Sequence, residues 1–350
     1  MRGATICGMT ELPRLWMRHE IRSTERRAPV VPADAALLVG SGVGVTVEES
    51  PQRAFPIADY AAAGCVIAPT GSWVDAPPDH YVVGLKELPD TPDALVHRHV
   101  YFGHAYKGQE GAAELLARFA AGGGELLDIE YLVDDDGRRL AAFGYWAGYV
   151  GAALAILHLR GRLTTPLRPT TRDELDAALR ESTASDPAGR AVVIGALGRS
   201  GRGARDAIAV AGLSPTCWDV AETRVLDRPA LLGHDILVNT VLTTRPVPPF
   251  LTDADVADPT RRLSVISDVT ADVTSDNNLL PIYAENTSWE RPAARLSDKP
   301  PLEIIAIDNL PSLLPVEASI AFSAELAPAL ARLGTGDPAW ERAVGAFRTR

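Results

Sequence analysis

The chain has few cysteines and no block of basic residues. Its three cysteines, Cys7, Cys65 and Cys217, lie far apart and match neither a disulfide framework nor a set of metal ligands. Isolated thiols are typical of a reducing compartment, so we expect a cytoplasmic protein. The net charge is −11, and the Lys and Arg residues are not gathered in one stretch. We therefore expect no nucleic-acid partner, since phosphates require a basic surface.

The chain also lacks a long run of large aliphatic residues. The N-terminus has no continuous apolar core of the kind found in secretory signals, and Met9 is an alternative start that would make residues 1–8 dispensable. Residues 140–159 carry no formal charge, so their length alone would allow a membrane span. This stretch is rich in Gly, Ala and Tyr, which favours a buried helix between two domains. We expect no membrane partner.

The composition is that of a globular α/β protein. With 46% hydrophobic and 23% charged residues, 350 residues can fill two domains of ordinary size. In the first part, short apolar stretches alternate with helical patterns, which predicts a parallel sheet with helices on both faces. The expected strands are residues 15–18, 43–47, 65–67, 81–85, 99–102 and 125–128, and the expected helices are 32–40, one ending at 60–64, and 109–121.

A second alternating run follows a helix expected at residues 145–159. Its expected strands include residues 191–193, 235–239 and 264–268, and a peripheral helix is expected at 172–180. Two further helices are expected at residues 324–333 and 339–347, and we expect them to pack on the first domain. The predicted domains are therefore residues 1–142 with 316–350, and residues 143–315.

The most informative motif is a glycine turn at residues 195–201, Gly-Ala-Leu-Gly-Arg-Ser-Gly, which follows the expected strand 191–193. A helical stretch comes next, and a second strand ends at Asp219, about 20 residues further on. Such glycines let the backbone approach a pyrophosphate, and the helix N-terminus offers N–H groups to it. Asp219 would bind the ribose hydroxyls and favour NAD, because it would repel a 2′-phosphate. The spacing is G-x-x-G-x-x-G, so a turn that only joins strand to helix is the alternative.

Candidate proton-transfer groups follow expected strands of the first domain. Lys86 lies at the C-terminal end of strand 81–85, the edge that lines the ligand crevice in open α/β sheets. It is a candidate base or a surface lysine. His104 follows the next strand and is a candidate acid or base, or a structural histidine. His97 and His99 form an H-x-H pattern, but no acid or cysteine nearby completes a zinc site, so we expect no metal.

Two further charged groups have open interpretations. Four arginines after the first strand would bind an acidic substrate or form a solvated basic loop; they are Arg18, Arg22, Arg26 and Arg27. Three acids resemble a metal loop but lack the spacing of a calcium site, and we expect a strand-end carboxylate and loop caps; they are Asp268, Asp272 and Asp276.

Six stretches in a fixed order resemble the lysine-forming, NAD-dependent saccharopine dehydrogenases, and the composition, rich in Ala, Arg and Asp, is typical of a bacterial member. The stretches are residues 84–87, 104–107, 137–144, 195–199, 218–219 and 308–315. The resemblance implies an α/β fold similar to that of alanine dehydrogenase. This fold has two Rossmann-like domains with parallel sheets and an interdomain cleft, the first domain for substrate and catalysis and the second for NAD.

The resemblance also implies the reaction, a reversible oxidative deamination of saccharopine to L-lysine and 2-oxoglutarate in lysine biosynthesis. Lys86 would take the amine proton, His104 would serve the hydrolytic steps, and Glu87 and Glu130 would balance their charges. Substrate binding is implied for Arg18, Lys107, Gln109, Glu130, Arg139, Phe143, Thr270, Ala271 and Asp272. Cofactor binding is implied for Arg138, Gly195, Gly198, Arg199, Asp219, Thr223, Leu242, Val269, Ile307, Asp308, Asn309 and Leu310. Which of the adjacent arginines, 138 or 139, faces the cofactor stays open.

The chain departs from the family at several positions. Ser200 stands where fungal members carry a cysteine, and a second cysteine of those members falls near Thr240; this chain has neither. Leu242 stands where a tyrosine is frequent. Asn309 and Val316 replace a usual histidine and arginine. Many bacteria make lysine by another route, so the alternatives are a reductive aminase that joins a different amine to 2-oxoglutarate or another oxoacid, and a non-catalytic NAD-binding sensor. We expect small-molecule substrates and a monomer or small homo-oligomer.

Overall fold

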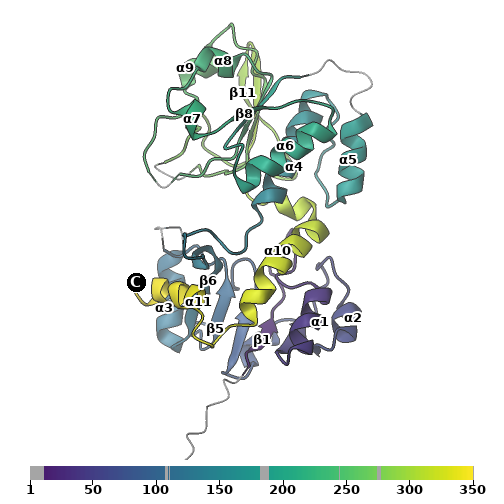
Figure 1. Ribbon diagram of the computed structural model, residues 1–350, viewed down its shortest axis with the longest axis vertical. Coiled ribbons are helices and arrows are strands. Elements are labelled where there is room, and N and C mark those ends of the chain that lie inside the picture. Colours follow the sequence, from purple (N-terminus) through teal and green to yellow (C-terminus); the bar gives the residue numbers. More distant parts are fainter. Residues whose placement is uncertain are drawn as a thin grey trace, which may run out of the picture. The chain divides into compact units, whose positions relative to one another are not determined.

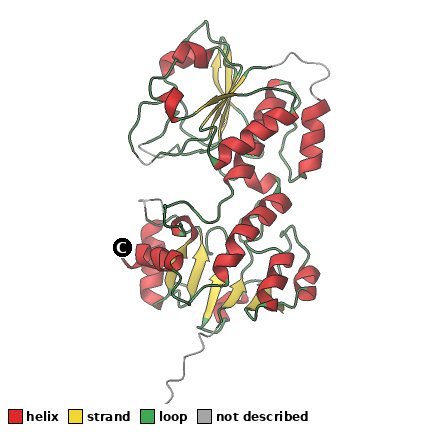
Figure 2. Cartoon of the chain, in the orientation of Figure 1, coloured by secondary structure: helices red, strands yellow, loops and turns green. Residues whose placement is uncertain are grey.

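The computed structural model describes residues 12–106, 109, 111–181, 189–243, 245–273 and 277–349. The chain divides into two compact units (Figure 1). Unit 1 comprises Met1–Ala142 and Ala318–Arg350, and unit 2 comprises Phe143–Glu317. Each unit contains a six-stranded sheet with helices packed around it (Figure 2).

Unit 1 is built on six parallel strands in the order β3-β2-β1-β4-β5-β6. The strands are β1 (Arg14–Met17), β2 (Gly44–Glu48), β3 (Val66–Ala68), β4 (His80–Val83), β5 (Arg98–Tyr101) and β6 (Glu125–Asp128). This is the order of a doubly wound sheet, in which the direction of winding reverses between β1 and β4. The parallel sheet expected from the alternating pattern is confirmed.

Helices cover both faces of the unit 1 sheet. They are α1 (Pro32–Gly40), α2 (Ile57–Ala62), α3 (Ala112–Gly122), α10 (Pro315–Leu330) and α11 (Pro338–Arg348), with short 3-10 helices η1 (Ser72–Asp75) and η2 (Ile129–Tyr131). In Figure 1, α3 and α11 lie beside β6, and the rings of Phe119 and Phe347 from these helices meet with centroids 5.6 Å apart. On α10, Ser319 Oγ accepts a hydrogen bond from the Ala28 main chain at 2.9 Å. The helix expected at 324–333 in fact begins at Pro315, because proline is favoured in the first helical turn.

Unit 2 contains a sheet in the order β11-β12-β10-β9-β7-β8. The strands are β7 (Ala191–Ile194), β8 (Thr216–Trp218), β9 (Ile236–Asn239), β10 (Val265–Asp268), β11 (Ala294–Asp298) and β12 (Pro301–Ile305). All neighbours are parallel except β11 and β12. The sheet is therefore parallel, as expected, except at this edge. Only residues 299 and 300 join the two strands, and so short a connection allows an antiparallel pair alone.

The uncharged stretch of the sequence forms the buried helix α4 (Gly144–Leu159), as expected. It packs closely against α6 (Arg199–Val210), since a side chain on Gly148 would collide with the Ser200 carbonyl and one on Gly203 with the Tyr145 carbonyl. The remaining helices of unit 2 are α5 (Arg172–Glu181), α7 (Val220–Thr223), α8 (Arg228–Leu232), α9 (Asp253–Ala257) and η4 (Leu310–Leu313). None of the helices in the described ranges has both the length and the apolar content needed to cross a membrane.

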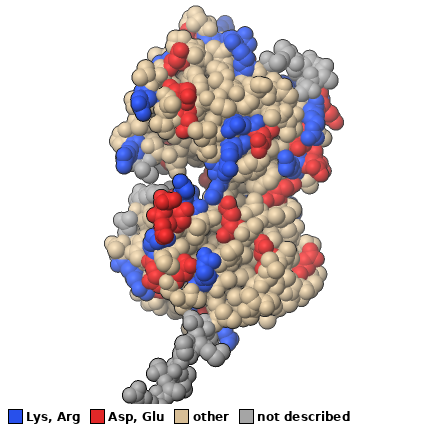
Figure 3. Space-filling model, viewed as in Figure 1, with Lys and Arg blue, Asp and Glu red and all other residues tan. Residues whose placement is uncertain are grey.

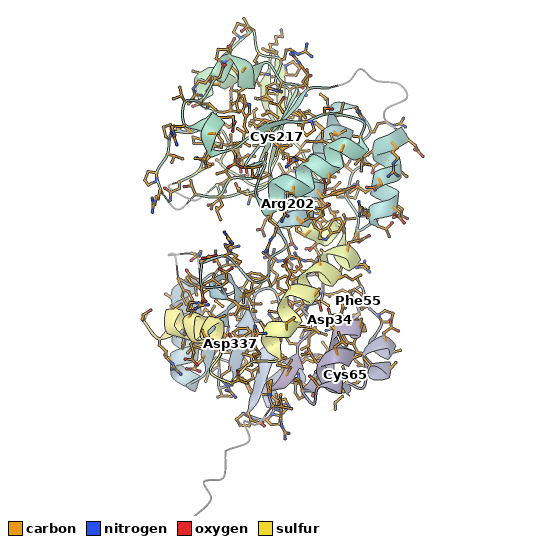
Figure 4. All side chains as sticks on the ribbon, viewed as in Figure 1. Asp34, Phe55, Cys65, Arg202, Cys217 and Asp337 are labelled. Atoms are coloured by element: carbon orange, nitrogen blue, oxygen red, sulfur yellow. The ribbon has the colours of Figure 1, made fainter. Side chains whose placement is uncertain are left out.

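The distribution of charge and the state of the cysteines agree with the sequence, which has no basic block and no disulfide framework. Acidic and basic residues are interspersed on the face seen in Figure 3. Cys65 in unit 1 is a buried free thiol and Cys217 in unit 2 is an exposed one (Figure 4). Cys7 lies outside the described residues.

Candidate active site

The carboxyl edge of the unit 1 sheet collects the candidate chemical residues. Arg18 follows β1, Lys86 follows β4, His104 follows β5 and Glu130 follows β6. These four strands are parallel neighbours in this order, so the four residues lie along one edge of the sheet. Open α/β sheets bind their ligands at this edge. The topology therefore brings together residues that the sequence separates by more than 100 positions.

His104 belongs to a small charged cluster. Its Nδ1 lies 3.9 Å from Glu130 Oε2, and the other carboxylate oxygen of Glu130 accepts a hydrogen bond from Arg139 Nη2 at 2.8 Å. The His104 side chain is 54% exposed, whereas Glu130 is largely buried. The His104 backbone has a φ of +49°, a left-handed conformation that is rare outside glycine and that directs the imidazole. A carboxylate beside an exposed imidazole suits a group that gains and loses protons.

Asp128, the last residue of β6, is a site residue that sequence reasoning missed. Its carboxylate is fully buried, and Oδ1 accepts the Glu130 N–H at 2.9 Å. Burial raises the pKa of Asp128 to about 6, against the opposing effect of the Glu130, Gly103 and His104 N–H groups. In the sequence Asp128 is indistinguishable from an ordinary strand end. The fold places it beside the main chain that carries His104.

Lys86 is partly buried near the start of the loop after β4, and Glu87 next to it is exposed. Glu87 forms a two-point ion pair with Arg22, with Nε–Oε1 at 2.9 Å and Nη2–Oε2 at 3.1 Å. Partial burial would raise the pKa of Glu87, but the hydrogen bonds from Arg22 hold it below its usual value. Glu87 therefore remains ionised next to Lys86, as its predicted charge-balancing role requires.

Arg18 is 1% exposed and makes its hydrogen bonds within unit 1. Its guanidinium donates to the carbonyl of Lys86 and, at 2.9 Å, to that of His19. It also lies against Gly84, where an added Cβ would stand 2.5 Å from Arg18 Nε. Arg18 and Gly84 follow the neighbouring strands β1 and β4, so the absence of a side chain at residue 84 makes room for the guanidinium. The role in substrate binding implied for Arg18 stays a prediction.

The H-x-H pattern forms part of the core of unit 1. His97 Nε2 is hydrogen-bonded to the Ala76 carbonyl at 2.7 Å. The His99 ring is fully buried between the rings of Trp73 and Phe119, and burial lowers its pKa far below the usual value. Both are structural histidines in this fold. In the described part of the chain, no group of three or more His, Cys, Asp or Glu residues is arranged to hold a metal ion.

The glycine turn of unit 2 has the geometry that a dinucleotide needs. Gly195 has a φ of +84°, and a Cβ there would stand 2.6 Å from Thr240 Oγ1. A Cβ on Gly201 would collide with the Gly195 carbonyl, so this glycine lets α6 start directly against β7. Gly198 is the N-cap residue of α6 and has no side chain with which to cap this helix end. The first N–H groups of α6 are thus oriented for a pyrophosphate.

Asp219 ends β8 beside this turn. Its Oδ2 accepts the Leu197 N–H at 3.0 Å, and its Oδ1 accepts the Val220 N–H at 2.9 Å. Thr223 closes the first turn of α7 by donating from Oγ1 to the Asp219 carbonyl at 2.9 Å. A carboxylate held at this point can accept hydrogen bonds from ribose hydroxyls and would repel a 2′-phosphate.

Exposed apolar side chains follow the neighbouring strands at the same edge. Leu197 follows β7, Val220 follows β8 and Leu242 follows β9, and they are 72%, 70% and 55% exposed. Large aliphatic side chains that project into solvent at a ligand edge provide a surface on which a purine ring can pack. The residues present therefore fit an adenine dinucleotide.

The loop after β10 is held by Asp268, the strand-end carboxylate expected from the sequence. It accepts hydrogen bonds from Asn239 Nδ2 at 3.0 Å, Thr270 Oγ1 at 2.7 Å and Tyr283 Oη at 2.8 Å. These contacts support Ala271 in a left-handed conformation, with a φ of +48°. The buried Asp268 carboxylate thus holds the loop that carries Thr270, Ala271 and Asp272, the residues implied in substrate binding. Asp276 lies outside the described residues.

Other implied site residues lie in several places. Arg138 is exposed and pairs with Asp136 at 3.4 Å, and Phe143 precedes the first turn of α4. Gln109 precedes α3, which begins at residue 112 and not at 109, because Gly111 before it has a φ of +75°. Lys107 lies outside the described residues.

Comparison with known proteins identifies the family. Residues 16–150 match the family described as "Alanine dehydrogenase/PNT, N-terminal domain". The "Saccharopine dehydrogenase [NAD(+), L-lysine-forming]" of Schizosaccharomyces pombe is 40% identical over 362 residues, covering 96% of this chain and 98% of that protein. The protein of the same name from Neurospora crassa is 40% identical over 353 residues, 95% of each chain. This chain belongs to the saccharopine dehydrogenase family.

Solved structures of similar fold agree with this family. An L-alanine dehydrogenase superposes with a TM-score of 0.67 at 17% identity, covering 96% of this chain and 93% of the other. A transhydrogenase from Sinorhizobium meliloti superposes with a TM-score of 0.61 at 15% identity, covering 91% and 94%. The expected α/β fold with two Rossmann-like domains is confirmed.

One departure from the saccharopine dehydrogenase pattern has a structural consequence. Asn309 stands where a histidine is usual, is buried, and donates from Nδ2 to Ser312 Oγ at 2.6 Å at the start of η4. Ile307 and Leu310 on either side of it are buried, whereas Asp308 is exposed. In this family member the side chain of Asn309 therefore supports the loop after β12.

Proposed function

We propose that the chain catalyses the NAD-dependent oxidative deamination of saccharopine to L-lysine and 2-oxoglutarate, and the reverse reductive amination. The observation that carries this proposal is the carboxyl edge of the unit 1 sheet, where Lys86 and His104 follow neighbouring strands. Unit 2 supplies the glycine turn and Asp219. The similarity to saccharopine dehydrogenases over nearly the whole chain supports the same substrate class.

The chemistry requires two different proton transfers. When the substrate is oxidised, C2 of its glutarate part loses a hydride and the adjacent nitrogen loses a proton, so a C=N bond forms. NAD, when bound at unit 2, would supply the acceptor for this hydride. Water then adds to the imine carbon, and the C–N bond of the adduct breaks to release the amine of lysine and the keto group of 2-oxoglutarate. Saccharopine, NAD and water thus give lysine, 2-oxoglutarate, NADH and a proton.

We assign the first transfer to Lys86 and the later ones to His104. An amine must be unprotonated before the neighbouring carbon can release a hydride, and Lys86 in its neutral form can accept that proton. His104 is exposed to solvent, so it can exchange protons with water while it assists hydration and C–N cleavage. Glu130 beside it stabilises the imidazolium form, and Arg139 orients that carboxylate.

We assign cofactor binding to the carboxyl edge of unit 2. The N–H groups at the start of α6, with the glycines of residues 195–201, would hold the pyrophosphate, and Asp219 would hold the adenine ribose. The loops after β10 and β12 would border the nicotinamide side. The remaining substrate and cofactor positions implied by the family resemblance are part of the same proposal.

The test is to follow NADH absorbance with purified protein, 2-oxoglutarate and a panel of amines. Oxidation of NADH with lysine, and reduction of NAD with saccharopine, is the expected result. Oxidation with a different amine alone would replace the proposal by a related reductive aminase. Tight NADH binding without turnover of any amine would indicate a sensor and overturn the enzymatic proposal.

We also propose that the protein acts in the cytoplasm, as a monomer or small homo-oligomer, and works on small molecules without a nucleic-acid or membrane partner. The free thiols of Cys65 and Cys217 and the acidic composition support this location. Fractionation of cells that produce the tagged full chain would test it.

A further inference from the structure

The main chain that carries Lys86 is held by two buried, oppositely charged side chains from the loop after β1. The Glu20 carboxylate accepts the Leu85 N–H at 2.7 Å and the Lys86 N–H at 3.0 Å. The Arg18 guanidinium donates to the Lys86 carbonyl. Both polar groups of the Lys86 peptide backbone are therefore bonded to charged groups on a segment more than 60 residues away.

The two side chains also restrain each other. Arg18 Nη1 lies 3.4 Å from Glu20 Oε2, and the residues are 1% and 5% exposed. The guanidinium is enclosed by the Tyr101 ring, whose centroid is 5.6 Å away, and by Gly84. Neither charge can move into solvent without opening the packed edge of the sheet.

Such an arrangement is costly unless it serves a purpose. Taking two charges out of water usually outweighs their attraction, so a buried ion pair is weak evidence of a stabilising role. The hydrogen bonds here are concentrated on residues 85 and 86, the point where the loop presents the Lys86 side chain. Charge-assisted bonds to both N–H groups and to the carbonyl fix that peptide more tightly than a simple turn would.

We propose that Glu20, together with Arg18, is the positioning element that fixes Lys86 for proton transfer. The inference rests on the proposed function, in which Lys86 is the base. Glu20 itself touches no substrate; it acts through the backbone of residues 85 and 86. A displacement of about 1 Å at a reacting group can lower the rate by about 100-fold.

The direct test replaces the Glu20 carboxylate by an amide. Glu20→Gln keeps the size but leaves one acceptor oxygen for two N–H groups, so the loop shifts. We expect kcat for saccharopine oxidation to fall by about 100-fold with an unchanged affinity for NADH. Glu20→Asp keeps the charge but is shorter by one methylene, and we expect an intermediate loss. This milder variant also keeps the test available if Glu20→Gln does not fold.

The matched control is Asp255→Asn. Asp255 is a buried carboxylate of unit 2 that accepts the Thr252 N–H at 2.8 Å and pairs with the Arg228 guanidinium. It combines a main-chain contact with an arginine partner, as Glu20 does, but it lies on α9 and not in the loop after β1. We expect this variant to lose stability while the pH dependence of its remaining activity stays unchanged.

A second readout does not depend on turnover. The chain contains three lysines, Lys86, Lys107 and Lys299. Protein grown with lysine labelled with carbon-13 at Cε therefore gives three resonances, which Lys107→Arg and Lys299→Arg assign. In Glu20→Gln we expect both the Lys86 resonance and its titration midpoint to shift, because the peptide that carries the Lys86 side chain is no longer held by two hydrogen bonds to a carboxylate. Asp255→Asn should leave the Lys86 resonance and its titration midpoint unchanged.

The outcomes separate the two hypotheses. If saccharopine is not a substrate, the proposed function fails, but the Lys86 resonance still tests the positioning role. The positioning proposal is overturned if folded Glu20→Gln keeps both its turnover and the titration of Lys86. It is also overturned if Asp255→Asn loses the same activity and shifts the Lys86 resonance equally, because Glu20 would then have only a general structural role.

Discussion

Glu130 holds its carboxylate 3.9 Å from the imidazole Nδ1 of His104 and shares it with Arg139. Glu130 follows β6 and His104 follows β5, so the pairing of these two strands creates the contact. The carboxylate favours the protonated imidazole, and the arginine limits that effect. This balance would keep His104 able both to give and to accept a proton.

Replacing Glu130 by glutamine is expected to lower the affinity of His104 for a proton. Without the negative charge the imidazolium is less stable, so His104 should titrate at lower pH and the later, hydrolytic steps should slow by about 10- to 100-fold. The measurements are a histidine NMR titration and the pH profile of kcat. An unchanged titration of His104 would show that Glu130 does not act on it electrostatically.

Replacing Lys86 by methionine is expected to remove the base while keeping a side chain of similar length. Turnover should fall by about 100- to 10,000-fold, while NADH binding, measured by fluorescence, should stay the same. Lys299→Met is the control, because Lys299 lies in the turn between β11 and β12 of unit 2. Normal turnover in Lys86→Met would exclude Lys86 from the mechanism.

Replacing Asp219 by alanine is expected to weaken NADH binding and narrow the preference for NADH over NADPH. A hydrogen bond to a charged group contributes about 1.5–3 kcal/mol, so the Kd should rise by at least about 10-fold. Asp227→Ala is the matched control, since Asp227 also caps a helix of unit 2, α8, through the Ala230 N–H. If Asp219→Ala keeps the full preference for NADH, a different residue contacts the ribose.

Replacing Asp128 by asparagine is expected to stabilise the protein at neutral pH. The pKa of Asp128 is about 6 in the folded chain against a usual 3.8. The protonated carboxyl group of Asp128 therefore contributes fully to the free energy of unfolding below pH 3.8, and this contribution is lost as the pH rises through about 6. At neutral pH the buried anion costs on the order of 3 kcal/mol, which asparagine avoids.

Denaturant unfolding of the parent and of Asp128→Asn at several pH values checks this expectation. The stability gain should be largest at neutral pH and should shrink as the pH falls towards 5. A variant that is less stable than the parent at neutral pH would contradict it. We expect activity to fall at the same time, because the carboxylate lies beside the backbone of Gly103 and His104.

Local patterns in the sequence were sufficient for much of the fold. The strand, glycine turn, helix and Asp219 of the cofactor edge lie within about 30 residues, and their geometry depends mostly on neighbours in the chain. The strands of unit 1 were likewise predicted, because buried parallel strands are short apolar runs. The hairpin of β11 and β12 was not predicted. Most of β11 is exposed and polar, so no apolar pattern marks it.

The sequence by itself determined which residue types were available: a glycine turn with a distal acid, a lysine and a histidine after strands, and the overall resemblance to one enzyme family. Only the tertiary structure decided what holds those residues in place. Glu20 reaches Lys86, and Asp128 lies beside His104, because β1, β4, β5 and β6 are neighbours in the sheet. A carboxylate in a linear sequence carries no sign of which backbone N–H it will meet, since strand pairing brings the two together.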